Sequence, residues 1–150
     1  MKLGFTGTRN GMTPQQWHAF CGLLEERQPT ELHHGSCVGA DSDAHCLFCR
    51  FAHNSDAVCE EALVVAHLPD KDDCRAYLSV EAENYGISMV QKKPLPYLTR
   101  NRNIVDSCDV LVACPAEMEE QQRGGTWSTV RYARKVGRDL VLILPDGSTA

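Results

Sequence analysis

The sequence has no long apolar run, no excess of positive charge, and no repeat or low-complexity linker. No stretch approaches the roughly 18 apolar residues of a membrane span, and the N-terminal segment breaks at Gly4, short of the about 7–15 apolar residues of a secretory signal. The net charge of −5 argues against a protein that coats nucleic acid or a membrane surface by charge alone. We therefore predict a single cytoplasmic domain over residues 1–150, with no membrane partner and with nucleic acid disfavoured as a partner.

The sequence has one CxxC motif, Cys46–Cys49, but no second pair of metal ligands to go with it. On a helix, Cys46, Cys49 and His53 would share one face, but no further CxxC or HxxxH supplies the fourth ligand of a zinc site. Other cysteines, such as Cys108 and Cys114, lie in apolar segments, where a free thiol behaves as a small hydrophobe. We interpret the eight cysteines as reduced thiols and expect neither a metal nor a cofactor, with zinc binding as the lesser alternative.

Strand and helix patterns alternate along the whole chain. The expected strands are Lys2–Thr6, Glu31–His34, Ala62–His67, Ile87–Val90, Asp109–Cys114 and Leu140–Leu144. The expected helices are Pro14–Arg27, Asp41–Ala52, Tyr97–Ser107 and Trp127–Val136, with a loop at Pro94 and Pro96. Alternating elements with apolar strands are typical of a mostly parallel sheet covered by helices. The sequence thus predicts an α/β fold, a Rossmann-like three-layer α/β/α sandwich.

Three loops rich in small residues follow expected strands, where ligands of such sheets bind. In the first, Gly7 permits close backbone approach, Thr8 offers a hydroxyl, and Arg9 offers a fork suited to phosphate. The second opens a helix and contains the candidate residues Gly35, Cys37, Gly39, Ala40 and Asp41. The carboxylate of Asp41 would repel phosphate, so we expect it either to cap its own helix or to accept hydrogen bonds from sugar hydroxyls.

The third loop combines two glycines with hydroxyl residues at a helix start, which makes an anion cradle. Its candidate residues are Arg123, Gly124, Gly125, Thr126, Trp127, Ser128 and Thr129. Further candidates are Pro115, which ends a strand, and the two cations Arg100 and Arg102 of the next-to-last helix. As residues of a solvated helix face these two arginines would be unremarkable.

In sequence order, these motifs resemble the SLOG superfamily. The resemblance rests on Gly4–Arg9, His34–Asp41, Arg100–Asp106 and Arg123–Ala133, and it spans the chain from Gly4 to about Leu144, weakest over residues 59–90. The superfamily joins the DNA-processing Smf/DprA proteins, the LOG-type cytokinin-activating phosphoribohydrolases and molybdenum-cofactor carrier-like proteins. The resemblance implies a Rossmann-like fold that binds nucleotides or nucleotide-derived ligands, and the dimeric LOG-type relatives imply a homo-oligomer.

One motif departs from the LOG-type pattern. Those hydrolases carry PGGxGTxxE, whose glutamate is needed to cleave the N-glycosidic bond, whereas that position here holds Tyr132, preceded by Arg131. Neither side chain can stabilise an oxocarbenium-like centre or activate water as a carboxylate does. Nothing in the spacing singles out one replacement among the remaining carboxylates Asp41, Asp43, Asp106 and Glu117.

The sequence therefore favours a binding module: a sensor or carrier of a phosphorylated nucleotide or nucleotide-derived ligand at the C-terminal edge of the sheet. The first alternative is a hydrolase or transferase acting on the N-glycosidic bond of a nucleotide. The second is a single-stranded DNA binder of the DNA-processing type, against which the acidic balance and the lack of a basic, aromatic-rich stripe argue. The base, the number of phosphates and the catalytic residues stay open.

Overall fold

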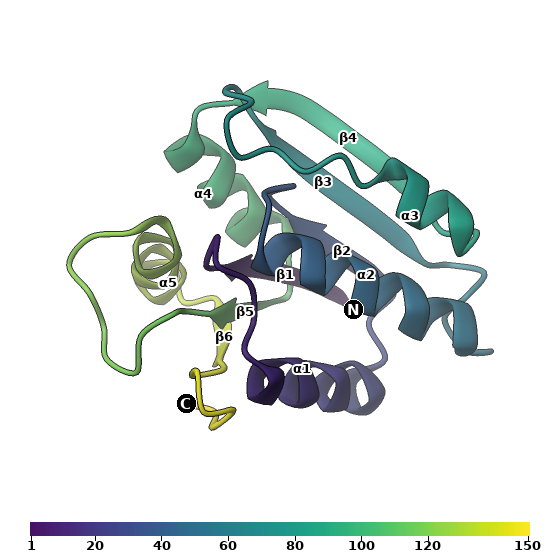
Figure 1. Cartoon of the computed structure of the whole chain (residues 1–150), viewed down its shortest axis with the longest axis horizontal. Helices are drawn as coiled ribbons and strands as arrows, with labels where there is room; N and C mark the ends of the chain where they lie inside the picture. Colours follow the sequence, from purple (N-terminus) through teal and green to yellow (C-terminus); the bar gives the residue numbers. More distant parts are fainter.

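The fold is a six-stranded, all-parallel sheet with helices on both faces, seen in a computed structural model that describes residues 1–150 (Figure 1). The strands are β1 (Lys2–Gly7), β2 (Glu31–His34), β3 (Leu63–Pro69), β4 (Ser88–Leu95), β5 (Val110–Cys114) and β6 (Asp139–Leu142). The helices are α1 (Pro14–Arg27), α2 (Ala40–Asn54), α3 (Ser79–Asn84), α4 (Tyr97–Ser107) and α5 (Gly125–Lys135). The predicted Rossmann-like α/β class is confirmed.

In the strand order β4-β3-β2-β1-β5-β6, the direction in which strands are added reverses between β1 and β5, at the centre of the sheet. The first four strands are added in one direction from β1, and β5 and β6 are then added on its other side. In an open parallel sheet, such a reversal leaves a crevice beyond the carboxyl ends of the two strands that flank it. The crevice here lies between the loops that leave β1 and β5.

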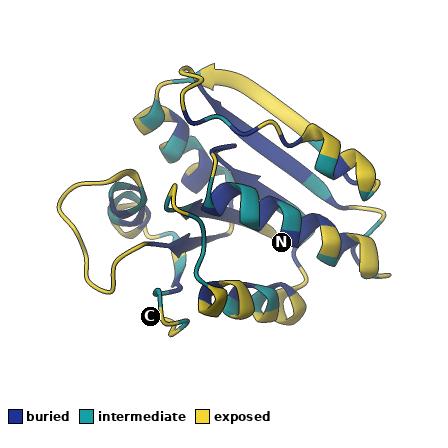
Figure 2. Ribbon diagram, in the orientation of Figure 1, coloured by how far each residue is buried: buried dark blue, intermediate teal, exposed yellow.

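Two helical layers cover the sheet. Helices α1 and α2 run side by side (Figure 1) and, with α3, bury the largest apolar cluster, which includes Phe5, Phe20 and Phe48. Helices α4 and α5 pack on the opposite face through two smaller clusters, centred on Leu111 and Val130. The central strands are buried, the edge strand β6 is partly buried, and the edge strand β4 is exposed along most of its length (Figure 2).

Helix α1 begins where the sequence predicts. Thr13 accepts a hydrogen bond from the backbone N–H of Gln16, and the Gln16 side chain accepts one from the backbone N–H of Thr13, which completes a capping box. The buried amide of Gln16 also donates to the carbonyl oxygens of Pro115 and Ile143, at 2.9 and 3.0 Å. The cap thus joins α1 to the ends of β5 and β6, beside the central crevice.

The structure corrects several predicted elements. β4 continues through Pro94 to Leu95, where we expected a loop, because an edge strand leaves one side unpaired and tolerates a residue without an N–H. The short helix α3 was not predicted, since six residues carry too little periodicity to register. Helix α5 begins at Gly125 rather than Trp127, and β6 ends at Leu142 rather than Leu144. Other ends differ by one or two residues, as fraying termini do.

Candidate functional site

A pocket of about 590 Å³ occupies the crevice at the reversal point. Segments distant in the sequence line it: the loops after β1, β2 and β5, the first turns of α4, and the start of α5. Its lining residues are Phe5, Thr6, Gly7, Thr8, Arg9, Asn10, Gly35, Cys37, Asp41, Tyr97, Leu98, Arg100, Asn101, Ile104, Ala116, Glu117, Arg123, Gly124, Gly125, Thr126 and Trp127. The three glycine-containing loops therefore meet at one place, as a shared sheet edge requires.

The first two loops pack directly on each other. Gly39 has a φ of +91°, and a side chain there would collide with the backbone of Arg9. A Cβ at Gly7 would likewise collide with the methyl group of Ala40. The backbone N–H of Ala40 donates to the carbonyl oxygen of Thr8 at 2.9 Å. Gly39 and Ala40 therefore shape the pocket from behind and do not line it.

Arg100 lies beneath the pocket and not on a solvated helix face. It is only 5% exposed, and its guanidinium donates to the carbonyl oxygens of Gly35 and His67 and to Asn101 Oδ1. No carboxylate lies within ion-pair distance of it. Arg100 thus fixes the second loop against β3 and leaves a positive charge under the pocket floor.

The carboxylate of Asp41 belongs to this same floor. It accepts a hydrogen bond from the backbone N–H of Cys37 at 3.2 Å, so it fixes the preceding loop rather than capping its own helix, whose cap is Gly39. Burial raises the pKa of Asp41 to about 6, opposed by the charge of Arg100 and by the N–H groups of Cys37 and Gly35. The side chain is therefore mostly ionised at neutral pH and largely protonated below pH 5.

The N-terminus of α5 forms the opposite wall. Gly124 has a φ of +112°, which few other residues adopt, and turns the chain into the helix. Ser128 donates its backbone N–H to Gly124, whereas the preceding N–H groups, those of Gly125, Thr126 and Trp127, have no partner within the helix. A Cβ at Gly125 would meet only Asn101, at 3.9 Å. The wall therefore presents unpaired donors and the positive end of the helix dipole.

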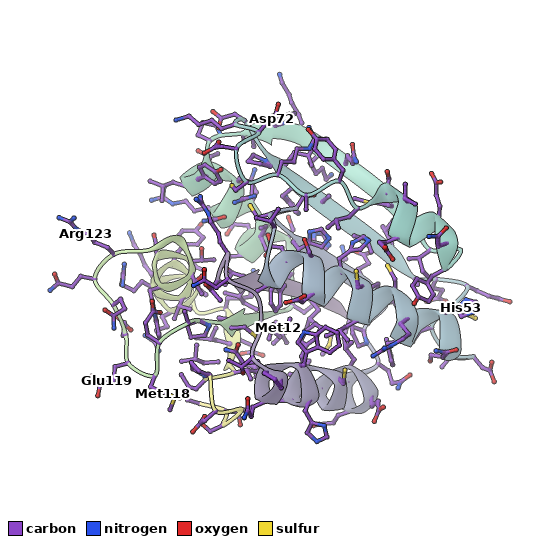
Figure 3. The ribbon with its side chains drawn as sticks, in the orientation of Figure 1. Met12, His53, Asp72, Met118, Glu119 and Arg123 are labelled. Carbon is purple, nitrogen blue, oxygen red and sulfur yellow. The ribbon has the colours of Figure 1, made fainter.

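Aromatic and acidic groups complete the site. The guanidinium carbons of Arg9 and Arg100 lie 5.6 and 5.2 Å from the centre of the Tyr97 ring. The buried indole of Trp127 donates through Nε1 to Glu117 Oε2 at 2.9 Å, which holds that carboxylate at the pocket. Arg123 lies on the exposed loop between β5 and α5, and its side chain projects outward from that loop (Figures 2 and 3).

Not every predicted site residue lines the pocket. Besides Gly39 and Ala40, the structure places four outside its lining: Arg102, Pro115, Ser128 and Thr129. Thr129 is buried and donates its hydroxyl to Gly125, and Pro115 accepts from Gln16. Arg102 and Ser128 line a separate groove of about 280 Å³ between α4 and α5. A residue on a helix points to one side of it only. A residue close to a pocket loop in the sequence therefore need not line the pocket.

The sequence analysis did not include Tyr97 or Asn101 among the candidate site residues. It named Glu117 only as a possible replacement for the missing glutamate and not as a ligand-binding residue. The first two occupy the start of α4, a helix whose N-terminus the sequence did not mark as part of the site. Of the four candidate carboxylates, Asp41 and Glu117 line the pocket. The other two are engaged elsewhere: Asp43 accepts from the backbone of Met12, and Asp106 accepts from Tyr132.

Cys46, Cys49 and His53, the residues of the alternative zinc site, do not come together around one point. Cys49 is buried and its Sγ contacts His45 at 3.7 Å, whereas the exposed His53 bonds the carbonyl oxygen of Tyr85. All eight cysteines are unpaired. None of the helices has the length and apolar character needed to cross a membrane.

Comparison with known proteins identifies the fold but no family. No family model matches the sequence, and no curated protein matches it either. Among solved structures, the chain is similar to DNA processing protein A (DprA) from Streptococcus pneumoniae, with a TM-score of 0.64 and 19% sequence identity over 94% of this chain. The match spans 49% of that protein, so this chain covers about half its length. At this identity the similarity shows a shared fold.

Proposed function

We propose that the pocket binds a phosphorylated nucleotide or a nucleotide-derived ligand, with its phosphate at the start of α5. The observation that carries this proposal is the convergence of unpaired backbone donors at Gly125–Trp127 with arginine side chains from other segments. A helix N-terminus favours an anion through both its free N–H groups and its dipole. The open space at Gly125 allows a phosphate oxygen to approach the backbone.

Arg9 would close the phosphate site from the first loop. Arg123, on the β5–α5 loop, projects outward and would have to turn toward the pocket to supply a second cation. The Asp41 carboxylate, on the floor formed by the second loop, suits the sugar hydroxyl groups, because an ionised carboxylate only accepts hydrogen bonds. A phosphate at the start of α5 and sugar hydroxyls toward Asp41 would match the charge pattern of a nucleotide.

Hydrolysis of an N-glycosidic bond is the second candidate, supported by the position of Glu117. The Trp127 indole holds this carboxylate at the edge of the pocket where the phosphate would bind. A carboxylate there could stabilise an oxocarbenium-like centre, the role that Tyr132 cannot fill. Tyr132 is instead bonded to Asp106, outside the pocket.

Single-stranded DNA is the third ligand to test, because the structural neighbour is named a DNA processing protein. The comparison gives no support to the sequence-based expectation that disfavours nucleic acid. The acidic net charge of −5 weighs against extensive phosphate contacts, so a DNA ligand would have to bind through the local arginines.

The test is a thermal-shift panel of nucleoside monophosphates, ADP-ribose, NAD, cyclic nucleotides and short single-stranded DNA, followed by chromatography of each stabilising compound. A ligand at one hundred times its Kd should stabilise the fold by about 2.7 kcal/mol, a rise in Tm of roughly 5–10 °C for a domain of this size. An unchanged ligand indicates a binder. Release of the free base, abolished by Glu117→Gln, would indicate the hydrolase.

Two variants locate the site. Gly125→Val should abolish the ligand-induced shift while the protein stays folded, because its side chain enters open space at the helix start. Arg9→Ala should weaken binding by about 1.5–3 kcal/mol, the range for a hydrogen bond to a charged group. Gly22→Val is the matched control, since Gly22 is exposed on α1 and far from the pocket. If both site variants respond like the parent, the ligand binds elsewhere.

A further inference from the structure

Two thiols face each other across the wall of the pocket. The Sγ atoms of Cys37, in the loop after β2, and Cys74, in the segment after β3, lie 3.8 Å apart. Both side chains are buried, with 9% and 4% of their surfaces exposed. The other cysteines have no such partner; Cys108 and Cys114, for example, lie singly in the core.

The backbone holds these two segments in fixed register. The N–H of Val38 donates to the carbonyl oxygen of Cys74 at 2.8 Å, and the N–H of Ala76 donates to that of Ser36 at 2.7 Å. Cys37 and Arg75 form an isolated antiparallel bridge between the same segments. The thiols therefore stay close without help from a covalent bond, and the two sulfurs have to approach each other by less than about 2 Å to reach the length of a disulfide bond.

We propose that Cys37 and Cys74 are a redox modification site, which a peroxide converts into a disulfide that clamps the pocket wall. Cys37 is the sulfur that lines the pocket, so a small oxidant reaches it first. The Arg100 guanidinium lies 3.8 Å from Cys37 Sγ and favours its thiolate. Burial and the charge of Asp41 outweigh this effect and raise the pKa of Cys37 to about 12, so we expect the oxidation to be slow at neutral pH and faster at high pH.

The chemistry balances with hydrogen peroxide as the oxidant. The Cys37 thiolate attacks one peroxide oxygen, the O–O bond breaks, and the products are Cys37 sulfenic acid and hydroxide. Cys74 then attacks the Cys37 sulfur, the S–O bond breaks, and a second hydroxide leaves as the disulfide forms. The protons of the two thiols convert both hydroxides to water, and the two sulfurs lose two electrons in total.

The disulfide would also alter the pocket lining. The Tyr97 hydroxyl contacts Cys74 Sγ, and the ring of Tyr97 lies beside the guanidinium groups of Arg9 and Arg100. Drawing Cys74 toward Cys37 removes this partner of the Tyr97 hydroxyl and frees the ring. The consequence for ligand binding rests on the proposed function, whereas formation of the disulfide does not.

Peptide mapping tests the proposal without any ligand. The protein is treated with hydrogen peroxide until the partly exposed Cys59 is oxidised, blocked by alkylation, and cut with trypsin and an Asp-specific protease. This digestion separates Cys37 from Cys46, because Asp41 lies between them. We expect a peptide pair joining Cys37 to Cys74. Recovery of both residues as alkylated thiols, or a link from either to another cysteine, would overturn the proposal.

Variants separate the pair from general oxidation. In Cys74→Ala, Cys37 should stop at the sulfenic acid, which dimedone traps, and no cross-link should form. Cys108→Ala, a change at another buried thiol, should leave the cross-link intact. Oxidised parent protein should melt several degrees higher than reduced protein, because the bond closes a loop over residues 38–73 in the unfolded chain. An equal rise in Cys74→Ala would contradict this assignment.

Discussion

A single buried cation, Arg100, organises the floor of the pocket. Its guanidinium binds the carbonyl oxygens of Gly35 and His67, and its charge lies near the carboxylate of Asp41. A buried arginine is retained only where its donors find acceptors, because an unpaired buried charge is costly. The surrounding carbonyl groups thus hold the positive charge in place, and the Asp41 carboxylate, mostly ionised at neutral pH, offsets part of it.

Replacement of Arg100 should destabilise the fold strongly. Arg100→Ala removes the guanidinium donors from the carbonyl oxygens of Gly35 and His67 and opens space beneath the loop, so we expect a loss of about 2–4 kcal/mol in the free energy of unfolding. Urea denaturation measures this loss. Arg102→Ala is the control, because Arg102 is exposed two positions later on the same helix and should change stability by less than about 0.5 kcal/mol. Equal effects of the two changes would contradict the structural role of Arg100.

Among the elements, α1 combines a strong start with a weak middle. The capping box at Thr13 fixes its beginning, and the side chains of Phe20 and Leu24 bury its apolar face. Gly22 interrupts the exposed side, and a Cβ there would meet no atom within 4 Å. The glycine therefore serves neither packing nor an unusual backbone conformation, and it costs helix stability through backbone entropy.

Gly22→Ala should stabilise the protein by about 0.5–1 kcal/mol, the difference in helix propensity between the two residues. The rise in Tm in a thermal melt measures the gain. The contrasting change is Gly39→Ala, which should destabilise by several times as much, because Gly39 has a φ of +91° and faces the backbone of Arg9. A neutral result at Gly39 would mean that the first two loops do not pack as described.

Across the whole molecule, four buried histidines couple stability to pH. They form two pairs: His33 with His67, and His34 with His45, each joined by a 3.0 Å contact between ring nitrogens. Burial lowers the pKa of all four, to about 4 for His45 and His67. A pair of this kind is satisfied when neutral, because one ring donates and the other accepts.

We expect the free energy of unfolding to fall as the pH drops from about 6.5 to 4. The unfolded histidines bind protons near pH 6.5, whereas folded His45 and His67 resist protonation until about pH 4. Each of these two should therefore cost about 2 kcal/mol at pH 5. Asp41 acts in the opposite direction, since its pKa is raised to about 6, but it is one group against four.

Denaturation curves at several pH values measure this dependence. His45→Gln should flatten the slope between pH 6.5 and 4, because it removes one of the groups that resist protonation. His18→Gln is the control, since His18 is exposed on α1 and should leave the slope unchanged. Stability that stays constant over this range, or rises, would contradict the neutral state of the paired histidines.

The elements that could be predicted from the sequence are those with local signals. Thr13, Pro14 and Gln16 mark the start of α1 by short-range hydrogen bonds, and the apolar run at residues 62–67 marks a strand buried on both faces. The three glycine-containing loops were recognisable because tight turns at strand ends need small residues whatever surrounds them. Helix α3 and the extension of β4 through Pro94 carry no such signal, since they depend on packing and on an edge position.

Which side chains face the central pocket depends on tertiary structure. The strand order places the ends of β1 and β5 side by side, and no residue pattern within either strand specifies that neighbour. The same order buries Arg100, which reads as a surface cation in the sequence, and turns Asp41 toward the loop before it. It also brings Cys37 to Cys74 across 36 intervening residues. Such contacts depend on long-range packing, because burial and pairing are properties of the assembled sheet and not of a local segment.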